Sequence, residues 1–223
     1  MSKNEDDLEF ERKAYVEQID RDSLISLILQ HPALFRKIYH ERTVNSLFYD
    51  TIQYTDYQEK INGLKTRRKT RIRWYGSLFG WVKEPVLEIK NKENGLRWKI
   101  RCPIHPFFID IHGNTAIQIQ YKKQDDLSRT QILMINRVPS SLISYRRIYF
   151  KSANRRFRLT VDDQLRFYSP LQNGQGWMIN QANPSGTIVE LKYSRDDDDD
   201  AREITSWYPF RWGSFSKYTQ SLD

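Results

Sequence analysis

The stretch that decides the fold is Lys69-Thr70-Arg71-Ile72-Arg73-Trp74-Tyr75, with its continuation Val86-Leu87-Glu88-Ile89-Lys90-Asn91-Lys92. Charged and apolar residues alternate along both segments, and a glycine-containing turn separates them, which predicts two β-strands. Side chains on a strand alternate between two faces, so Lys69, Arg71 and Arg73 share one face. Neighbours on one face lie roughly 7 Å apart, close enough for several cations to bind one polyanion.

The same alternation recurs along the rest of the chain. It predicts strands at 8–16, 44–51, 96–101, 144–150, 156–162 and 187–193. A helix is expected after an N-cap at Asp20 or Asp22, a second short helix at 34–38, and another at 130–135. The tyrosine-rich residues after Thr51 are interpreted as a polar link. The acidic run 196–200 is interpreted as a solvated loop, because it lacks the glycine and terminal glutamate of a calcium-binding loop.

The charged faces of these strands are mostly Lys and Arg, which leaves two arrangements open. The faces lie on an open surface in water, or they converge on an enclosed space. Convergence predicts an α+β fold, an antiparallel β-barrel tunnel of about eight strands with flanking helices and a charged lumen. Buried cations are costly unless an anion accompanies them, so such a lumen implies a polyanion. Because the sequence shows no fixed-period repeat and no linker, we expect residues 1–223 to form a single domain.

Composition narrows the classes of partner and compartment. A net charge of +8 favours an anionic partner without specifying it. No apolar run approaches ~18 residues and the first seven residues are polar, so we expect a cytoplasmic chain without a membrane segment. Cys102 is the only cysteine, which excludes a disulfide or a cysteine zinc site within the chain. The sequence contains neither a Walker-type phosphate loop nor a dinucleotide-binding glycine fingerprint.

Several short segments follow one another along the chain in the same order as in a known protein family. They are Ser46-Leu47-Phe48-Tyr49-Asp50-Thr51, Arg71-Ile72-Arg73-Trp74-Tyr75-Gly76, Leu87-Glu88-Ile89-Lys90, Arg158-Leu159-Thr160-Val161-Asp162, Val189-Glu190-Leu191-Lys192 and Phe215-Ser216-Lys217-Tyr218. Together they resemble the catalytic domain of the vacuolar transporter chaperone (VTC) family, polyphosphate polymerases within the triphosphate tunnel metalloenzyme (CYTH-like) superfamily. The likeness covers roughly residues 9–218. It implies a single tunnel domain that transfers the γ-phosphoryl group of ATP to a polyphosphate chain in a metal-dependent reaction.

The resemblance also implies roles for individual residues. The expected catalytic residues are Lys13, Arg71, Arg73, Lys90 and Lys217. The expected substrate-binding residues are Lys69, Lys99, Arg147, Arg158 and Lys192, and the expected metal ligand, for Mn²⁺ or Mg²⁺, is Glu190. Arginine offers a planar fork that matches phosphate oxygens in pairs, whereas lysine acts as a point charge. One glutamate suffices where water and phosphate supply the other metal ligands.

Some observations keep other interpretations open. Ser214 stands where some family members carry a second lysine near the C-terminus, which puts chain affinity or turnover in doubt. Each cation could be a solvated surface charge, and Glu190 could form an ion pair with a neighbouring cation. Glu11 and Glu88 are expected to partner lysines.

The expected ligands are ATP and polyphosphate or pyrophosphate, and no nucleic acid is expected. A partner protein associated with a membrane is compatible with these ligands. The alternatives are a hydrolase of tripolyphosphate or a related triphosphate, and a non-catalytic module that binds polyphosphate or inositol polyphosphate. A third alternative is a nucleic-acid binder that stacks bases on Trp74, Tyr75 and Trp98.

Overall fold

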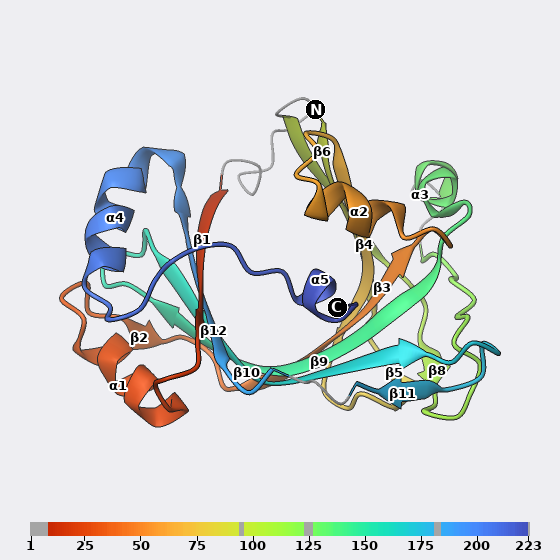
Figure 1. Cartoon of the computed structure of the whole chain (residues 1–223), viewed down its shortest axis with the longest axis horizontal. Coiled ribbons are helices and arrows are strands. Elements are labelled where there is room, and N and C mark those ends of the chain that lie inside the picture. Colours follow the sequence, from red (N-terminus) through yellow and green to blue (C-terminus); the bar gives the residue numbers. More distant parts are fainter. Residues whose placement is uncertain (1–8, 94–95, 123–126, 181–183, 223) are drawn as a thin grey trace. The chain divides into compact units, whose positions relative to one another are not determined.

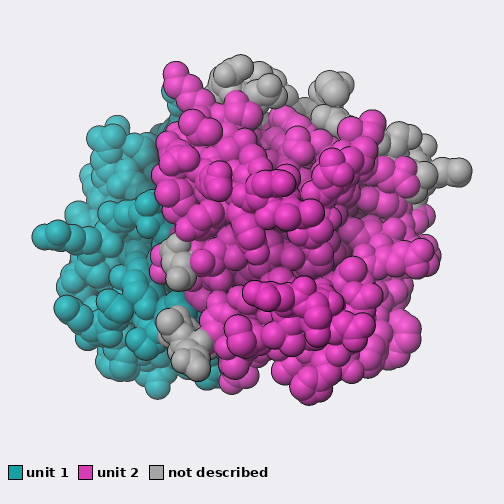
Figure 2. All heavy atoms as spheres, turned by 45° about the vertical axis from the view of Figure 1, so that its right-hand side comes forward, with its two compact units in different colours: residues 1–42, 145–165, 184–215 teal, residues 43–144, 166–183, 216–223 magenta. Residues whose placement is uncertain are grey.

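The computed structural model describes residues 9–93, 96–122, 127–180 and 184–222. The chain forms two compact units, shown in separate colours in Figure 2. Unit 1 contains residues 1–42, 145–165 and 184–215, and unit 2 contains residues 43–144, 166–183 and 216–223. The chain therefore passes from one unit to the other several times. The expectation of a single domain over residues 1–223 stays a prediction.

Unit 1 is built on antiparallel strands with helices on their apolar face (Figure 1). The strands follow the order β1 (Glu9–Val16), β12 (Thr187–Ser194), β10 (Arg158–Pro170) and β9 (Val138–Lys151), of which the last two also contribute residues to unit 2. The helices are α1 (Arg21–Gln30), the 3₁₀ turn η3 (Arg195–Asp197) and α4 (Asp198–Ser206). Leu24 of α1 and Ile204 of α4 belong to the same buried cluster as Leu159 and Leu191 of the sheet.

Unit 2 has a second set of antiparallel strands. Their order is β3 (Arg42–Asp50), β4 (Arg67–Tyr75), β6 (Val86–Glu93) and β7 (Leu96–Pro103). Two short strands pair separately, β5 (Gly80–Val82) with β8 (Phe107–Ile109), and β11 (Trp177–Ile179) pairs with β10. The helices of this unit are α2 (Thr55–Ile61), α3 (Leu127–Met134) and α5 (Lys217–Gln220). The buried cluster of unit 2 includes Ile72, Leu87 and Ile89 from the apolar faces of β4 and β6.

These pairings confirm the α+β class and the antiparallel sheet that alternation predicts. In each unit the apolar face of the strands belongs to the hydrophobic core, and the charged residues occupy the opposite face. Among the described residues, the hydrogen-bonded order has two ends, β1 and β7, so the ladder is not closed.

The short helix expected at 34–38 is wrong. Leu34 has a left-handed backbone (φ 52°), which a helix does not allow, and the chain continues as the short strand β2 (Arg36–Lys37) paired with β9. Phe35 is nevertheless buried in the unit 1 core, as its apolar character indicates. A strand of two residues is too short to show an alternation of apolar and polar side chains, so the sequence does not predict β2.

The polar link expected after Thr51 is also wrong, since it contains α2. The carboxylate of Asp50 accepts hydrogen bonds from the backbone N–H groups of Asp56 and Tyr57, at 2.9 and 3.0 Å. These donors lie in the first turn of α2, where backbone N–H groups have no partner inside the helix. A side chain outside the helix therefore stabilises its start.

The acidic run forms η3 and the first turn of α4 instead of a loop. Carboxylates are favourable at a helix N-terminus, where the backbone dipoles leave partial positive charge. Asp198 also pairs with Arg12 at 3.0 Å, and Asp197 with Arg156 at 2.6 Å. The acidic run therefore forms the start of a helix, and arginines pair with two of its carboxylates.

His31 joins the end of α1 to α4. Its Nδ1 accepts a hydrogen bond from the Ala33 backbone N–H at 2.9 Å, and its Nε2 lies 3.2 Å from the Ile204 carbonyl oxygen. A ring nitrogen that accepts carries no proton, so the neutral tautomer with hydrogen on Nε2 satisfies both contacts. The side chain is 4% exposed, and burial lowers the pKa of His31.

We expect acidification to destabilise the protein through His31. Its folded-state pKa lies below its unfolded value of about 6.5, so stability is lost as pH falls below that unfolded value. The variant His31→Gln keeps a donor toward Ile204 and cannot titrate. Urea unfolding at several pH values should therefore show a weaker pH dependence for His31→Gln than for the wild type, with His40→Gln at an exposed position as the matched control. Equal slopes in the wild type and His31→Gln would contradict this assignment.

Candidate functional site

The register of unit 2 places basic side chains directly opposite one another. Lys69 on β4 faces Lys90 on β6, and Lys90 faces Lys99 on β7. Directly opposed side chains on one face have Cβ atoms about 5 Å apart, and like charges in these positions are destabilising. We call Lys69, Lys90 and Lys99 the lysine row. Its electrostatic cost falls when an anion binds to it.

The adjacent row of unit 2 is centred on Glu88. This residue lies opposite Arg71 on one side and Arg101 on the other. Arg71 donates from Nε and Nη2 to Glu88 Oε2 at 2.8 and 2.6 Å, while Arg101 Nε lies 3.4 Å from Oε1 and Arg73 Nη1 lies 3.7 Å from Oε2. Burial of the 2% exposed side chain opposes ionisation, but Arg71 and Arg73 hold the pKa of Glu88 well below its usual value. Glu88 is therefore an anion that orients arginines.

An aromatic pair borders the lysine row. Phe48 on β3 stacks on Tyr218 of α5, with ring centroids 5.0 Å apart. The ammonium group of Lys69 lies 4.9 Å from the centroid of Phe48 and 5.9 Å from that of Tyr218. The electron-rich faces of these rings attract the cation and restrict its position. Lys217 precedes Tyr218 on the same short helix.

Unit 1 has a comparable face centred on Glu190 of β12. This residue lies opposite Lys13 of β1 and Thr160 of β10. Its carboxylate lies 3.6 Å from Lys192 Nζ and 3.8 Å from Arg147 Nη2. These two distances are longer than those between Glu88 and Arg71.

The cations around Glu190 remain charged. Burial opposes the charge on Lys13, but Glu190 and Glu11 raise its pKa, and Glu11 Oε1 accepts from Lys13 Nζ at 3.0 Å. Arg147 is held by Asp162 at 2.5 and 2.6 Å, and this carboxylate raises the pKa of Arg147 despite burial. The unit 1 face therefore mixes fixed positive groups with carboxylates.

The predicted site residues occur in two groups. Unit 2 contains Lys69, Arg71, Arg73, Lys90, Lys99 and Lys217, and unit 1 contains Lys13, Arg147, Arg158, Glu190 and Lys192. The register brings Arg158 opposite Lys192. Sequence reasoning paired Glu88 with lysines, whereas its closest partner is Arg71; it also gave no role to Arg101 or Tyr218. Strand alternation places Arg101 on the basic face, but only the register shows that it meets Glu88.

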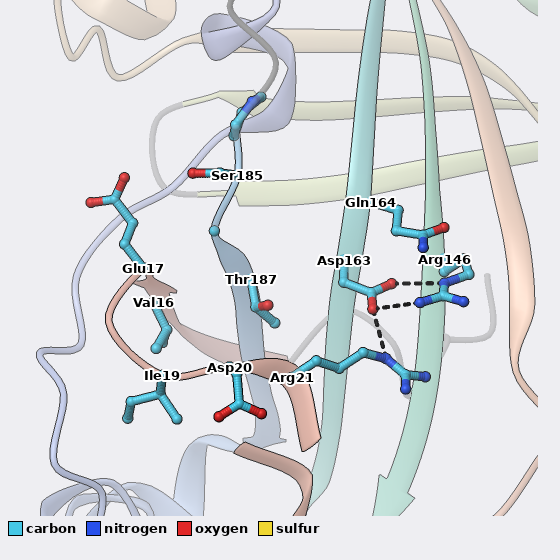
Figure 3. Close-up of a pocket in the computed structure, with 12 residues that line it drawn as sticks. Val16, Glu17, Ile19, Asp20, Arg21, Arg146, Asp163, Gln164, Ser185 and Thr187 are labelled. Carbon is cyan, nitrogen blue, oxygen red and sulfur yellow. Dashed lines mark hydrogen bonds and ion pairs between the residues drawn. The ribbon is translucent and has the colours of Figure 1, made fainter. Parts of the chain in front are cut away.

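A pocket of about 380 Å³ lies elsewhere in unit 1 (Figure 3). Arg21 and Arg146 on its wall both reach Asp163, with Arg21 Nε 2.7 Å and Arg146 Nη2 3.0 Å from Oδ2. Glu41 pairs with both arginines as well. Because carboxylates already match the guanidinium charges, this pocket offers little attraction to an anion, and no predicted site residue lines it.

Glu190 fits a metal site in which the protein supplies a single carboxylate. Within the described ranges, no group of three or more His, Cys, Asp or Glu side chains is arranged to hold a metal ion. Glu190 itself is a buried carboxylate that lies 3.8 Å from Arg147 and 3.6 Å from Lys192. A single carboxylate of this kind fits Mg²⁺ or Mn²⁺ when water and phosphate oxygens complete the coordination. Glu88 does not fit, because Arg71 occupies its oxygen.

The fold has counterparts among solved structures of low sequence identity. A proposed adenylate cyclase from Bacillus halodurans has a TM-score of 0.58 at 11% identity, with 97% of this chain and 98% of that chain covered. A proposed adenylyl cyclase from Hippeastrum, described as having a dominant triphosphatase activity, has a TM-score of 0.54 at 14% identity over 96% and 95% of the two chains. A proposed adenylate cyclase from Vibrio parahaemolyticus has a TM-score of 0.53 at 14% identity over 96% and 97%. No curated protein matches the sequence.

These solved structures share the antiparallel fold of this chain. The family described as "VTC domain" matches residues 8–223, and the chain belongs to that family. The match extends over both units, as the resemblance in sequence predicts. Among the described residues, no helix is long and apolar enough to span a membrane.

We expect Glu88→Gln to destabilise unit 2 by about 3 kcal/mol, because it leaves Arg71 and Arg73 beside a neutral amide. The measurement is the free energy of unfolding in urea at neutral pH, with Glu84→Gln at an exposed site as the matched control. The depressed pKa of Glu88 means that its contribution is present above the unfolded pKa of about 4.3 and is lost as pH falls further. The difference between wild type and variant should narrow below about pH 4. Equal stability of the two variants at neutral pH would contradict the role of Glu88.

Proposed function

We propose that this VTC domain is an ATP:polyphosphate phosphotransferase, which extends a polyphosphate chain with the γ-phosphoryl group of ATP. The observation that carries the proposal is the basic face of unit 2, where the lysine row lies beside arginines oriented by Glu88. Membership of the VTC family supports the same reaction. A face on which cations outnumber carboxylates suits a long anion such as polyphosphate or a triphosphate.

Phosphoryl transfer suits these residues because it requires mainly positioning and charge neutralisation. The bond between the γ-phosphorus and the β–γ bridging oxygen breaks, and its electron pair leaves with ADP. A new bond forms between the γ-phosphorus and a terminal oxygen of the polyphosphate chain. Arg71 and Arg73 are proposed to hold phosphate oxygens in pairs, and Lys90 and Lys217 to neutralise charge as point cations.

The unit 1 face is proposed to serve the same reaction. Lys13, Arg147, Arg158 and Lys192 supply further phosphate contacts. Glu190 would hold Mn²⁺ or Mg²⁺, which supplies charge neutralisation to phosphate oxygens when bound. The buried position of Glu190 on the basic face of unit 1 supports this role.

A second candidate is hydrolysis of tripolyphosphate or a related triphosphate. The triphosphatase activity described for the Hippeastrum structure, which shares the fold, favours it. In that reaction water takes the place of the polyphosphate chain as acceptor, and the same cations hold the substrate. Orthophosphate release without chain growth distinguishes hydrolysis from polymerisation.

The proposed function predicts that protein incubated with ATP and Mn²⁺ forms ADP and polyphosphate in step. We expect Glu190→Gln to lower turnover at least about a hundredfold, because electrostatic stabilisation of the transferred group is lost, while tripolyphosphate still binds within about threefold. Enzymatic ADP detection, gel analysis of chain length and isothermal titration calorimetry measure these quantities. Absence of both products with wild-type protein would contradict the proposal, and so would metal-dependent turnover that survives in Glu190→Gln.

Loss of a lysine from the lysine row should weaken phosphate binding. We expect Lys90→Ala to raise the dissociation constant of tripolyphosphate about tenfold, since a charge-assisted hydrogen bond contributes about 1.5–3 kcal/mol. Its salt dependence should become weaker as well, because one charge contact is missing. The matched control is Lys83→Ala, an exposed lysine beyond the end of β5. If both variants bind tripolyphosphate like the wild type, the lysine row is not a phosphate site.

A further inference from the structure

The helix α5 is short, yet Tyr218 on it and Ser221 just after it make several specific contacts within unit 2. Tyr218 donates to Asp50 Oδ2 at 2.5 Å, and Ser221, just after the helix, accepts a hydrogen bond on Oγ from Ser141 at 2.7 Å. Asn180 donates to the carbonyl oxygen of Ser221 at 3.1 Å. A four-residue helix is not stable by itself. These contacts therefore determine where α5 lies.

Asp50 is the central hydrogen-bond acceptor in the contacts that hold α5; we call it the hub. Its carboxylate accepts the Tyr218 hydroxyl and also the backbone N–H groups of Asp56 and Tyr57 at the start of α2. Asp50 is fully buried at the end of β3, two residues from Phe48. One carboxylate thus joins β3, α2 and α5. Burial, with the neighbouring carboxylate, raises the pKa of Tyr218, so its hydroxyl stays protonated as the donor.

The ring of Tyr218 connects this hub to the basic face. It stacks on Phe48, and Lys69 of the lysine row lies over both rings. Lys217 is the preceding residue of α5, so the direction of its side chain depends on how the helix is held. Neither Tyr218 nor Asp50 carries a charge that would bind phosphate. Their contribution is the placement of two lysines.

We propose that Tyr218 is a positioning residue, which fixes Lys217 and Lys69 for phosphate binding through its contacts with Asp50 and Phe48. The inference rests on the proposed function, because it gives both lysines a phosphate contact. It goes beyond that function by making activity depend on an uncharged hydroxyl. Lys217 is the only Lys or Arg among the four residues of α5.

The first test is the anchoring itself, measured by amide hydrogen exchange of residues 216–222. Tyr218→Phe removes the hydrogen bond to Asp50 and keeps the ring. We expect exchange in this segment to accelerate about tenfold or more. The matched control is Tyr208→Phe, because Tyr208 is equally buried, at 4% exposure, and its hydroxyl has no hydrogen-bond partner among the described residues. Unchanged exchange in Tyr218→Phe would overturn the inference whatever the activity shows.

The second test is a double-mutant cycle on kcat/KM for ATP and on the dissociation constant of tripolyphosphate. Lys217→Ala and Tyr218→Phe should each reduce kcat/KM about tenfold. If Tyr218 acts through Lys217, adding Tyr218→Phe to Lys217→Ala should reduce it less than about twofold further. A full multiplicative loss in the double variant would overturn the positioning role, since a general structural effect has that signature.

The two tests separate the inference from the function beneath it. If wild-type protein neither turns over ATP nor binds tripolyphosphate, the proposed function and the phosphate role of α5 are wrong. The hydrogen-exchange data still show whether Tyr218 holds α5 in place. Wild-type activity with a Tyr218→Phe variant indistinguishable from Tyr208→Phe overturns the positioning role alone. Faster exchange with a non-additive loss of kcat/KM supports it.

Discussion

Cross-strand register is the constraint on which the candidate site depends. In an antiparallel pair, each residue meets one partner, so the sequence spacing of charges on one strand becomes a two-dimensional array only through pairing. In unit 2 this pairing sets Lys69, Lys90 and Lys99 in line and places Glu88 between Arg71 and Arg101. A shift of one residue would move every one of these side chains to the apolar face. The buried Ile72, Leu87 and Ile89 on that face therefore hold the basic array in place.

The two central glutamates show how one residue type takes two roles. Glu88 accepts two short hydrogen bonds from Arg71, and its negative charge orients that guanidinium group. Glu190 lies 3.6 Å from Lys192 and 3.8 Å from Arg147, while Asp162 holds Arg147 at hydrogen-bond distance. Asp162 thus does for Arg147 what Glu88 does for Arg71. Because Arg71 occupies an oxygen of Glu88, we propose Glu190 as the metal ligand.

Alternation of charged and apolar residues was enough to predict most strands and the faces that they present. Lys69, Arg71 and Arg73 share the basic face for that reason, and Ile72 and Trp74 are buried. The elements that alternation could not reveal depend on partners distant in sequence. The strand β2 forms by pairing with β9, and the first N–H groups of α2 donate hydrogen bonds to a carboxylate at the end of β3. The contact of Tyr218 with Asp50 joins residues 168 positions apart, and no local pattern reports it.

The most direct measurement of the central claim is a crystal structure of the protein with tripolyphosphate. We predict phosphate oxygens within hydrogen-bond distance of Lys69, Lys90 and Lys99, with Arg71 still paired to Glu88. This prediction would be contradicted by tripolyphosphate bound away from both basic faces, with these lysines directed only to water or to protein carboxylates.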